Sequence, residues 1–172
     1  LRKPRREIEH SFTSALDFIE EKSVREHVCV LVSGDPCLYS YLSILKSRFQ
    51  AERIEVIPGI SSFQLLAAKS AVLWNEAVVV SVHGRSKESI IPAFKAHKRI
   101  VILTDPEHTP VEIAKLLSES GWGNSTLILG KNLSYPDEKI LTMSARQLAE
   151  KKEIEEGLWV MIAERTHERS TE

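Results

Sequence analysis

The sequence predicts an α/β fold, in which strands and helices alternate along the chain. Apolar runs of strand length, such as residues 28–32 and 77–82, contain no polar alternation, which is typical of strands buried on both faces of a sheet. Stretches with helical periodicity follow these runs, and glycine or proline turns separate the two. The 172 residues allow two small lobes, which we expect at 1–76 and 77–172 with a cleft between them.

The first lobe is expected to begin with an amphipathic helix at residues 7–20. A strand at 28–32 and a helix at 38–49 follow, and then a strand at 54–57 and a helix from residue 62 to about residue 70. A unit of this order predicts parallel strands joined by right-handed crossovers.

The second lobe has clearer helix signals than the first. Thr109 followed by Pro110 and Glu112 predicts a helix start, and Ser144 with Gln147 predicts a capping box. Short strands follow one another near the end of the chain, so the sheet is expected to be mixed. We expect strands at 77–82, 100–103, 126–129, 139–142 and 158–163, and helices at 87–97, 109–121 and 144–152.

Two glycine turns end the two expected strands of the first lobe. Ser33-Gly34-Asp35-Pro36 follows the first strand, and Pro58-Gly59-Ile60-Ser61-Ser62 follows the second. Ligands of open α/β sheets bind at the carboxyl ends of strands, and glycine lets a ligand approach the backbone. Asp35 has an alternative role as the N-cap of the next helix. The two turns are expected to form the rim of one cleft.

Composition narrows the function class. The net charge of −1 disfavours a general nucleic-acid binder, and no apolar run is long enough to cross a membrane. The cysteines are expected to be unpaired in a reducing cytoplasm, with Cys29 in the core and Cys37 beside the cleft. No group of residues has zinc-ligand spacing, so no metal is predicted.

Five motifs along the chain resemble those of the tetrapyrrole methylase family. The first two are S-G-D-P at residues 33–36, with Tyr39 close behind, and V-I-P-G-I-S-S at 56–62. The other three are S-V-H-G-R at 81–85, L-T-D at 103–105 and G-K-N-L-S-Y-P-D-E at 130–138. These three resemble the branch that methylates carbon-5 of a precorrin or cobalt-precorrin in vitamin B12 (cobalamin) biosynthesis.

The resemblance implies an S-adenosylmethionine-dependent C-methyltransferase with the cofactor held in the cleft between two α/β lobes. For the leucines among the implied cofactor residues, core packing is the alternative. The implied cofactor residues are Gly34, Asp35, Leu38, Tyr39, Gly59, Ser61 and Ser62 from the first lobe, and Leu103, Thr104, Asn132, Leu133 and Ala163 (or its neighbour Ile162) from the second.

The implied substrate carries carboxylates on its rim, so its site should present fixed cations. Arg85 is the first choice, because its planar guanidinium matches a carboxylate, and His83 and Lys131 are second choices. The alternative for each is a solvated loop charge. Carbon-5 is enamine-like and can attack the methyl group in line, so catalysis is mainly placement, and we assign no catalytic residue.

Two alternative functions are also open at this point, one within enzymes and one of a different class. One is a family relative that acts on another precorrin position, on rRNA or on diphthamide, and another is a non-catalytic nucleotide-binding domain. The family opens with a strand and a GxGPG-like loop that this sequence does not contain, so the substrate site is expected to be incomplete in it.

The resemblance also implies partners. It implies a precorrin substrate, a homodimer and a separate enzyme that methylates carbon-15 and decarboxylates. No nucleic acid or membrane is expected as a partner.

Overall fold

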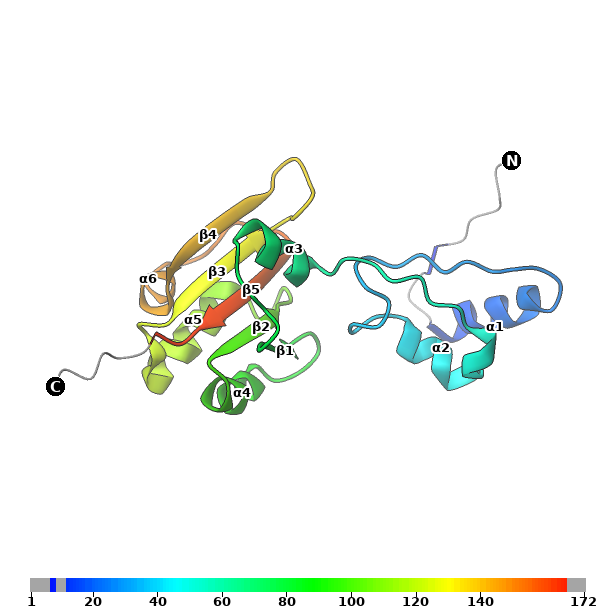
Figure 1. Cartoon of the computed structure of the whole chain (residues 1–172), viewed down its shortest axis with the longest axis horizontal. Coiled ribbons are helices and arrows are strands. Elements are labelled where there is room, and N and C mark those ends of the chain that lie inside the picture. Colours follow the sequence, from blue (N-terminus) through cyan, green and yellow to red (C-terminus); the bar gives the residue numbers. More distant parts are fainter. Residues whose placement is uncertain (1–6, 9–11, 167–172) are drawn as a thin grey trace. The chain divides into compact units, whose positions relative to one another are not determined.

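The computed structural model describes residues 7–8 and 12–166, which belong to two compact units (Figure 1). The units are Leu1–Ser61 and Ser62–Glu172. Every strand within the described residues belongs to the second unit. Helix α3 (Ser62–Lys69) precedes the lobe boundary expected at residue 76, yet it packs on the sheet of the second unit. The lobes at 1–76 and 77–172 stay a prediction.

The second unit is built on a five-stranded mixed sheet in the order β1-β2-β5-β3-β4. Strands β1 and β2 are parallel, and the three other pairs of neighbours are antiparallel. The α/β class and the mixed sheet predicted from the sequence are therefore confirmed. The strands are β1 (Val78–Ser81), β2 (Arg99–Leu103), β3 (Thr126–Lys131), β4 (Lys139–Ser144) and β5 (Trp159–Glu164).

Two helices of the second unit begin at the caps that the sequence predicts, although α6 ends at Ala149, before residue 152, and the helix expected at 87–97 is divided into η2 and α4. The Thr109 hydroxyl oxygen accepts the Glu112 N–H, and Ser144 and Gln147 form the predicted capping box. Gly121, with a φ of 89°, interrupts the helical conformation after α5. The elements are η2 (Lys87–Ser89), α4 (Ile90–Ala96), α5 (Pro110–Leu117), the single-turn η3 (Ser118–Trp122) and α6 (Ala145–Ala149).

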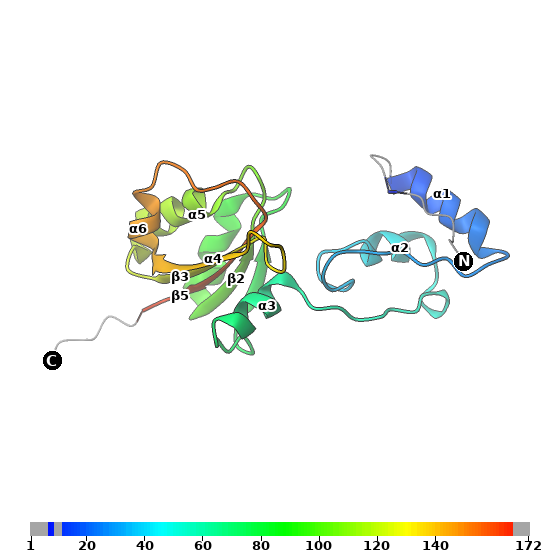
Figure 2. The same ribbon diagram turned by 90° about the horizontal axis from the view of Figure 1, so that it is seen from above.

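Both faces of the sheet are covered, which explains the unbroken apolar strands. Figure 2 shows α3 on one side of the sheet and α5 and α6 on the other. Alternate strand residues face each side. Helix α3 contributes buried Phe63, Leu66 and Ala67. The other face forms a core in which Ile102, Leu129 and Met161 are fully buried together with residues of α4, α5 and α6.

The first unit contains α1 (Phe12–Ser23), α2 (Leu42–Arg48) and the short η1 (Ala51–Arg53). Arg48 joins the two α-helices, since its guanidinium lies 2.9 Å from Asp17 Oδ1 and 2.6 Å from Glu20 Oε2. A small core of Ala15, Leu16, Tyr41 and Phe49 lies beneath.

Several expectations for the first unit are wrong. Residues 28–32 and 54–57 are not strands in the structure, and helix α2 begins only at Leu42. Leu31 is 85% exposed, and Cys29, expected in the core, is exposed as well. An apolar extended segment becomes a strand only when a neighbour hydrogen-bonds to it, and within the described residues no neighbour pairs with either segment. The parallel strand–helix unit expected there is therefore not formed.

Candidate functional site

Most of the candidate site residues that the sequence predicts in the second unit lie at one edge of the sheet. Strand β5 is antiparallel to both β2 and β3, so β1, β2 and β3 all run in one direction. Their carboxyl ends therefore lie at one edge, together with the start of β5. Ligands of α/β sheets bind at edges of this kind. The residues at this edge are His83, Arg85, Leu103, Thr104, Lys131, Asn132 and Leu133.

The turn after β1 carries His83 and Arg85. The Val82 N–H donates to Leu103 O over 3.1 Å, and the Arg85 N–H donates to Val82 O over 2.9 Å. Gly84, at the third position of this turn, has a φ of 63°, which glycine adopts without steric cost. His83 and Arg85 are both exposed.

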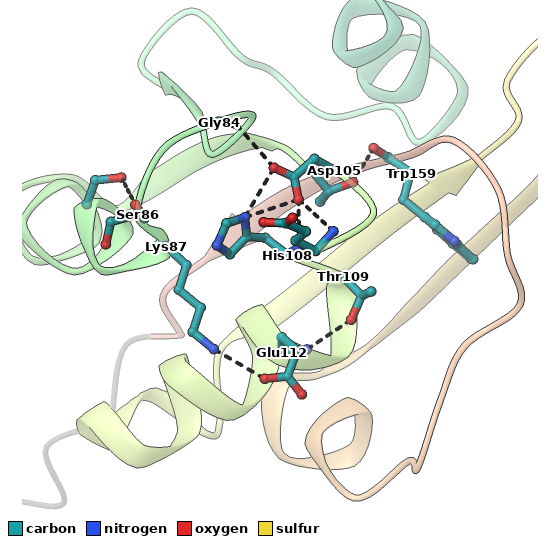
Figure 3. Close-up of polar contacts among 11 residues, drawn as sticks. Gly84, Ser86, Lys87, Asp105, His108, Thr109, Glu112 and Trp159 are labelled. Atoms are coloured by element: carbon teal, nitrogen blue, oxygen red, sulfur yellow. Dashed lines mark hydrogen bonds and ion pairs between the residues drawn. The ribbon is translucent and has the colours of Figure 1, made fainter.

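Asp105, directly after β2, accepts hydrogen bonds from two loops (Figure 3). Its Oδ1 accepts the N–H groups of Glu107 (2.9 Å) and His108 (2.6 Å), and its Oδ2 accepts the Gly84 N–H (3.3 Å). The His108 Nδ1 lies 3.1 Å from both oxygens. Burial raises the pKa of Asp105, but these hydrogen bonds outweigh it and hold the pKa below its usual value. The carboxylate is therefore ionised at neutral pH.

Two further contacts fix this part of the edge. The Thr104 hydroxyl donates to Trp159 O over 2.7 Å, which joins the end of β2 to the start of β5. Lys87 of η2 lies 3.2 Å from Glu112 of α5 (Figure 3). The loops after β1 and β2 are therefore tied to each other and to their neighbours.

Asn132 ends β3 in a conformation that few residues adopt. Its φ is 45°, and its Oδ1 accepts the Leu158 N–H over 2.7 Å. Its N–H donates to Leu158 O over 2.9 Å, and its side-chain amide donates to Asp137 over 2.6 Å. Asn132 thus holds the chain before β5 and the loop after β3 together. Such positions are concentrated at functional sites.

Lys131 is buried, unlike a typical loop cation. Its side chain is 8% exposed, and its Nζ lies 2.9 Å from Glu155 Oε2 and 3.8 Å from Asp137 Oδ2. Glu155 also contacts Lys139. The bonds from Lys139 and Lys131 lower the pKa of Glu155 to about 2. The charge of Lys131 is therefore balanced within the protein.

Leu133 covers the end of β3. Because Gly130 has no side chain, methyl groups of Leu133 and Leu66 can lie where its Cβ would be, within 3.1 Å of that position. Leu133 is half-buried, so part of it packs on the strand and part of it remains accessible.

The two glycine turns of the first unit lie against each other. A Cβ at Gly59 would collide with the carbonyl oxygen of Gly34, and a Cβ at Gly34 would lie 3.7 Å from the Cα of Ser61. Gly34 has a φ of 71°. The adjacency of the two turns that the sequence predicts is therefore present, although no sheet supports it within the described residues.

Other candidate residues of the first unit surround these turns. Asp35 Oδ1 accepts the Cys37 N–H over 2.7 Å, so it caps a turn and does not cap helix α2. Leu38 is half-buried, and Tyr39 is 52% exposed with a φ of 47°. Ser61 is buried.

Ser62 and Ala163 have other surroundings. Ser62 is the exposed first residue of α3. Ala163 pairs with Ile100 and Leu127 at the other end of the strands and is fully buried in the core. Ile162 beside it is fully buried too, so neither residue joins the edge.

Sequence reasoning assigned no role to Asp105, His108 or Glu155. A polar residue directly after a buried strand was the available signal for Asp105, since the next loop needs an acceptor there. Within the described residues, no group of His, Cys, Asp or Glu side chains could hold a metal ion. In the same part of the chain, no helix is both long and apolar enough to cross a membrane.

The fold is that of an α/β protein with a mixed sheet. Over residues 2–149 the chain matches the Tetrapyrrole (Corrin/Porphyrin) Methylases. It belongs to that family.

The proteins that are similar to the chain include two curated relatives and one solved structure. It is 34% identical over 113 residues to the cobalt-precorrin-7 C(5)-methyltransferase of Salmonella typhimurium, which covers 66% of this chain and 55% of that one. It is 31% identical to the probable cobalt-precorrin-7 C(5)-methyltransferase of Methanocaldococcus jannaschii, covering 77% and 64% of the two chains. The precorrin-6Y methylase structure from Archaeoglobus fulgidus matches with a TM-score of 0.66 and 26% identity, covering 93% and 74%. The chain thus spans less than two thirds of these curated relatives.

Proposed function

We propose that this protein is an S-adenosylmethionine-dependent methyltransferase that methylates carbon-5 of a precorrin or cobalt-precorrin in cobalamin biosynthesis. One observation carries the proposal. The three stretches that resemble the carbon-5 branch, at 81–85, 103–105 and 130–138, all meet at the carboxyl-end edge of one sheet. The curated relatives named above carry the same activity in their names.

The turns of the first unit fit the methionine end of S-adenosylmethionine. Gly34 leaves backbone groups without a side chain in front of them, Gly59 lets the two turns approach closely, and the Asp35 carboxylate is an acceptor suited to an ammonium group. The hydroxyls of Ser61 and Ser62 can hydrogen-bond to a carboxylate. The bound cofactor supplies an activated methyl group on a sulfonium.

The edge of the second unit fits the apolar and polar parts of an adenosine. Leu103 and Leu133 are half-buried and offer apolar surface, while Thr104 and Asn132 bring polar groups beside them. Tyr39 and Asn132 have left-handed backbone conformations. This supports their proposed role in cofactor binding, because strained positions of this kind are concentrated at ligand sites. The cofactor roles of Leu38 and Gly59 are part of the same proposal, whereas Ala163 is left out of it, because Ala163 is fully buried at the other end of the strands.

Arg85 is the proposed partner of a substrate carboxylate. It lies exposed on a turn that is held by two backbone–backbone hydrogen bonds and by the bond from the Gly84 N–H to Asp105, with exposed His83 beside it. Lys131 is a weaker candidate than the sequence suggested, because Glu155 already balances its charge. An Arg–carboxylate pair fixes direction as well as distance, which suits a rigid macrocycle.

Placement is the catalytic contribution that these residues can make. The proposed groups hold carbon-5 in line with the methyl group, so that carbon-5 forms a bond to the methyl carbon as the bond from carbon to sulfur breaks. Positioning of this kind contributes about 7–11 kcal/mol to lowering a barrier. The proton on carbon-5 leaves after the transfer, and we assign no residue to it.

Mass spectrometry of the macrocycle after incubation with the protein and S-adenosylmethionine tests the function. Gain of one methyl group that depends on both supports it. Methylation of another precorrin, of rRNA or of diphthamide in place of this substrate would assign the chain to another branch of the family. Cofactor binding without transfer to any of these would favour a non-catalytic nucleotide-binding domain.

We further propose a homodimer located in the cytoplasm, and a separate enzyme for carbon-15 methylation and decarboxylation. Exposed, unpaired Cys29 and Cys37 are compatible with a reducing compartment. Light scattering of the purified protein tests the homodimer.

A further inference from the structure

The Asp105 carboxylate serves two loops with its two oxygens. Oδ1 accepts the N–H groups of Glu107 and His108, which belong to its own loop. Oδ2 accepts the Gly84 N–H, which belongs to the loop after β1. The Asp105 side chain is only 7% exposed, whereas Gly84 lies at the surface, so the bond of 3.3 Å connects a buried carboxylate to an exposed turn.

We propose that Asp105 is a positioning residue, which fixes the His83-Gly84-Arg85 turn and thereby aims Arg85 at the substrate carboxylate. The inference rests on the proposed function for the role of Arg85. It adds a residue that acts through another and does not itself touch the substrate.

The bond to Asp105 connects the tip of the turn to the loop after β2. Val82 N–H donates to Leu103 O, and Arg85 N–H closes the turn on Val82 O. A Cβ on Gly84 would meet no heavy atom within 4 Å, so this side of the turn faces open space. Without the bond from its N–H, the tip of the turn loses its hydrogen bond to the loop after β2.

A carboxylate can accept hydrogen bonds from both loops at once, whereas an amide cannot. Asparagine has one acceptor oxygen and one donor group at the end of the same skeleton. In Asp105→Asn the oxygen can serve Glu107 and His108, but the amide NH2 then faces the Gly84 N–H, donor against donor. The substitution therefore removes the contact between the loops while it conserves volume, and it also changes one of the two contacts with His108 Nδ1.

Glu112→Gln is the matched control. The Lys87–Glu112 pair joins η2 and α5, the elements that follow these two loops, without touching the turn. If the edge needs only a contact between these regions, Asp105→Asn and Glu112→Gln should have the same effects. If Asp105 orients the turn, they differ.

The first measurement is hydrogen exchange of the Gly84 amide by NMR, which needs no substrate. In the unmodified protein we expect protection of this amide, and in Asp105→Asn we expect exchange faster by roughly tenfold or more, with Glu112→Gln unchanged. An unprotected Gly84 amide in the unmodified protein overturns the proposal even where the variant fails to fold. Equal exchange in Asp105→Asn and the unmodified protein does the same.

The second measurement is a double-mutant cycle on macrocycle turnover. We expect Asp105→Asn to raise the KM for the macrocycle roughly tenfold, with kcat and cofactor affinity nearly unchanged, and to add little to Arg85→Ala. Fully additive effects overturn the positioning role while Arg85 keeps its own. If Arg85→Ala leaves macrocycle turnover unchanged, Arg85 does not bind the substrate and Asp105 does not orient it for that purpose. Transfer of a methyl group to the macrocycle would still support the proposed function.

Discussion

Gly59 lies directly against the carbonyl group of Gly34. A Cβ at Gly59 would collide with the Gly34 oxygen and would lie 3.2 Å from its carbonyl carbon. The atoms that it would meet belong to the backbone, so no side chain can turn aside to make room. The contact fixes how closely the turn after residues 28–32 approaches the turn after residues 54–57.

Gly59→Val should therefore separate the two turns. Inserting a β-branched side chain into a close contact of this kind costs about 1–3 kcal/mol, and we expect a lower Tm together with weaker S-adenosylmethionine binding. Calorimetric titration of the cofactor measures the second effect. Ser62→Ala is the control, because Ser62 is exposed and its change should reduce the affinity less. Equal and small effects of the two substitutions would show that the turn contact does not shape the cofactor site.

The sequence predicts the second unit better than the first for a physical reason. Its strands have neighbours on both sides or helices on both faces, so apolar runs and caps such as Thr109 and Ser144 suffice to find them. Residues 28–32 have the same apolar pattern but no strand beside them within the described residues, and Leu31 is exposed. An apolar pattern indicates that a segment prefers burial, but it does not indicate which strand the segment will pair with.

The candidate site was predictable only in part. Polar motifs directly after β1, β2 and β3 identified the edge, because the carboxyl ends of strands that run the same way meet there. The ion pair of Lys131 with Glu155 joins residues far apart in sequence, and the sequence alone gives no pattern for it. The same holds for the bond between Asp105 and Gly84.

Arg85→Ala should weaken macrocycle binding and leave cofactor binding nearly unchanged. A hydrogen bond to a charged group contributes about 1.5–3 kcal/mol, so the macrocycle Kd should rise by roughly one to two orders of magnitude. Arg85→Lys should restore only part of the affinity, because an ammonium group cannot make the forked contact. Titration of each ligand separately checks this. A common loss for both ligands, with a lower Tm, would mean that Arg85 supports the fold.

The lowered pKa of Glu155 predicts that the stability of the protein depends on pH. The pKa of Glu155 is lowered to about 2 by the bonds from Lys139 and Lys131, so the unfolded chain binds the proton more tightly than the folded protein does. Its stabilising contribution is present above a pH of about 4.5 and is lost as the pH falls toward 2. We expect the Tm of the unmodified protein to fall more steeply through this window than the Tm of Glu155→Gln. Glu153→Gln, an exposed neighbour, should follow the unmodified protein. A constant difference between Glu155→Gln and the unmodified protein across the window would rule out the ion pairs as its cause.

The Ser144 capping box should matter for stability alone. Removing an N-cap side chain costs about 1 kcal/mol, which for a protein of this size lowers the Tm by about 2–4 °C. Ser144→Ala should show that decrease in thermal melts. Ser89 precedes α4 without making a side-chain cap bond, so Ser89→Ala should lower the Tm less. Cofactor and macrocycle affinities should be the same in both variants. An equal decrease in Tm would show that the box adds nothing beyond an ordinary surface hydroxyl.

Transfer of a 13C-labelled methyl group from S-adenosylmethionine to the macrocycle tests the central proposal most directly. NMR of the product locates the label. We predict one new labelled methyl on carbon-5, formed by the unmodified protein and much more slowly by Gly59→Val and Arg85→Ala. A label on any other carbon, or no transfer from a protein that binds both ligands, would contradict carbon-5 methylation.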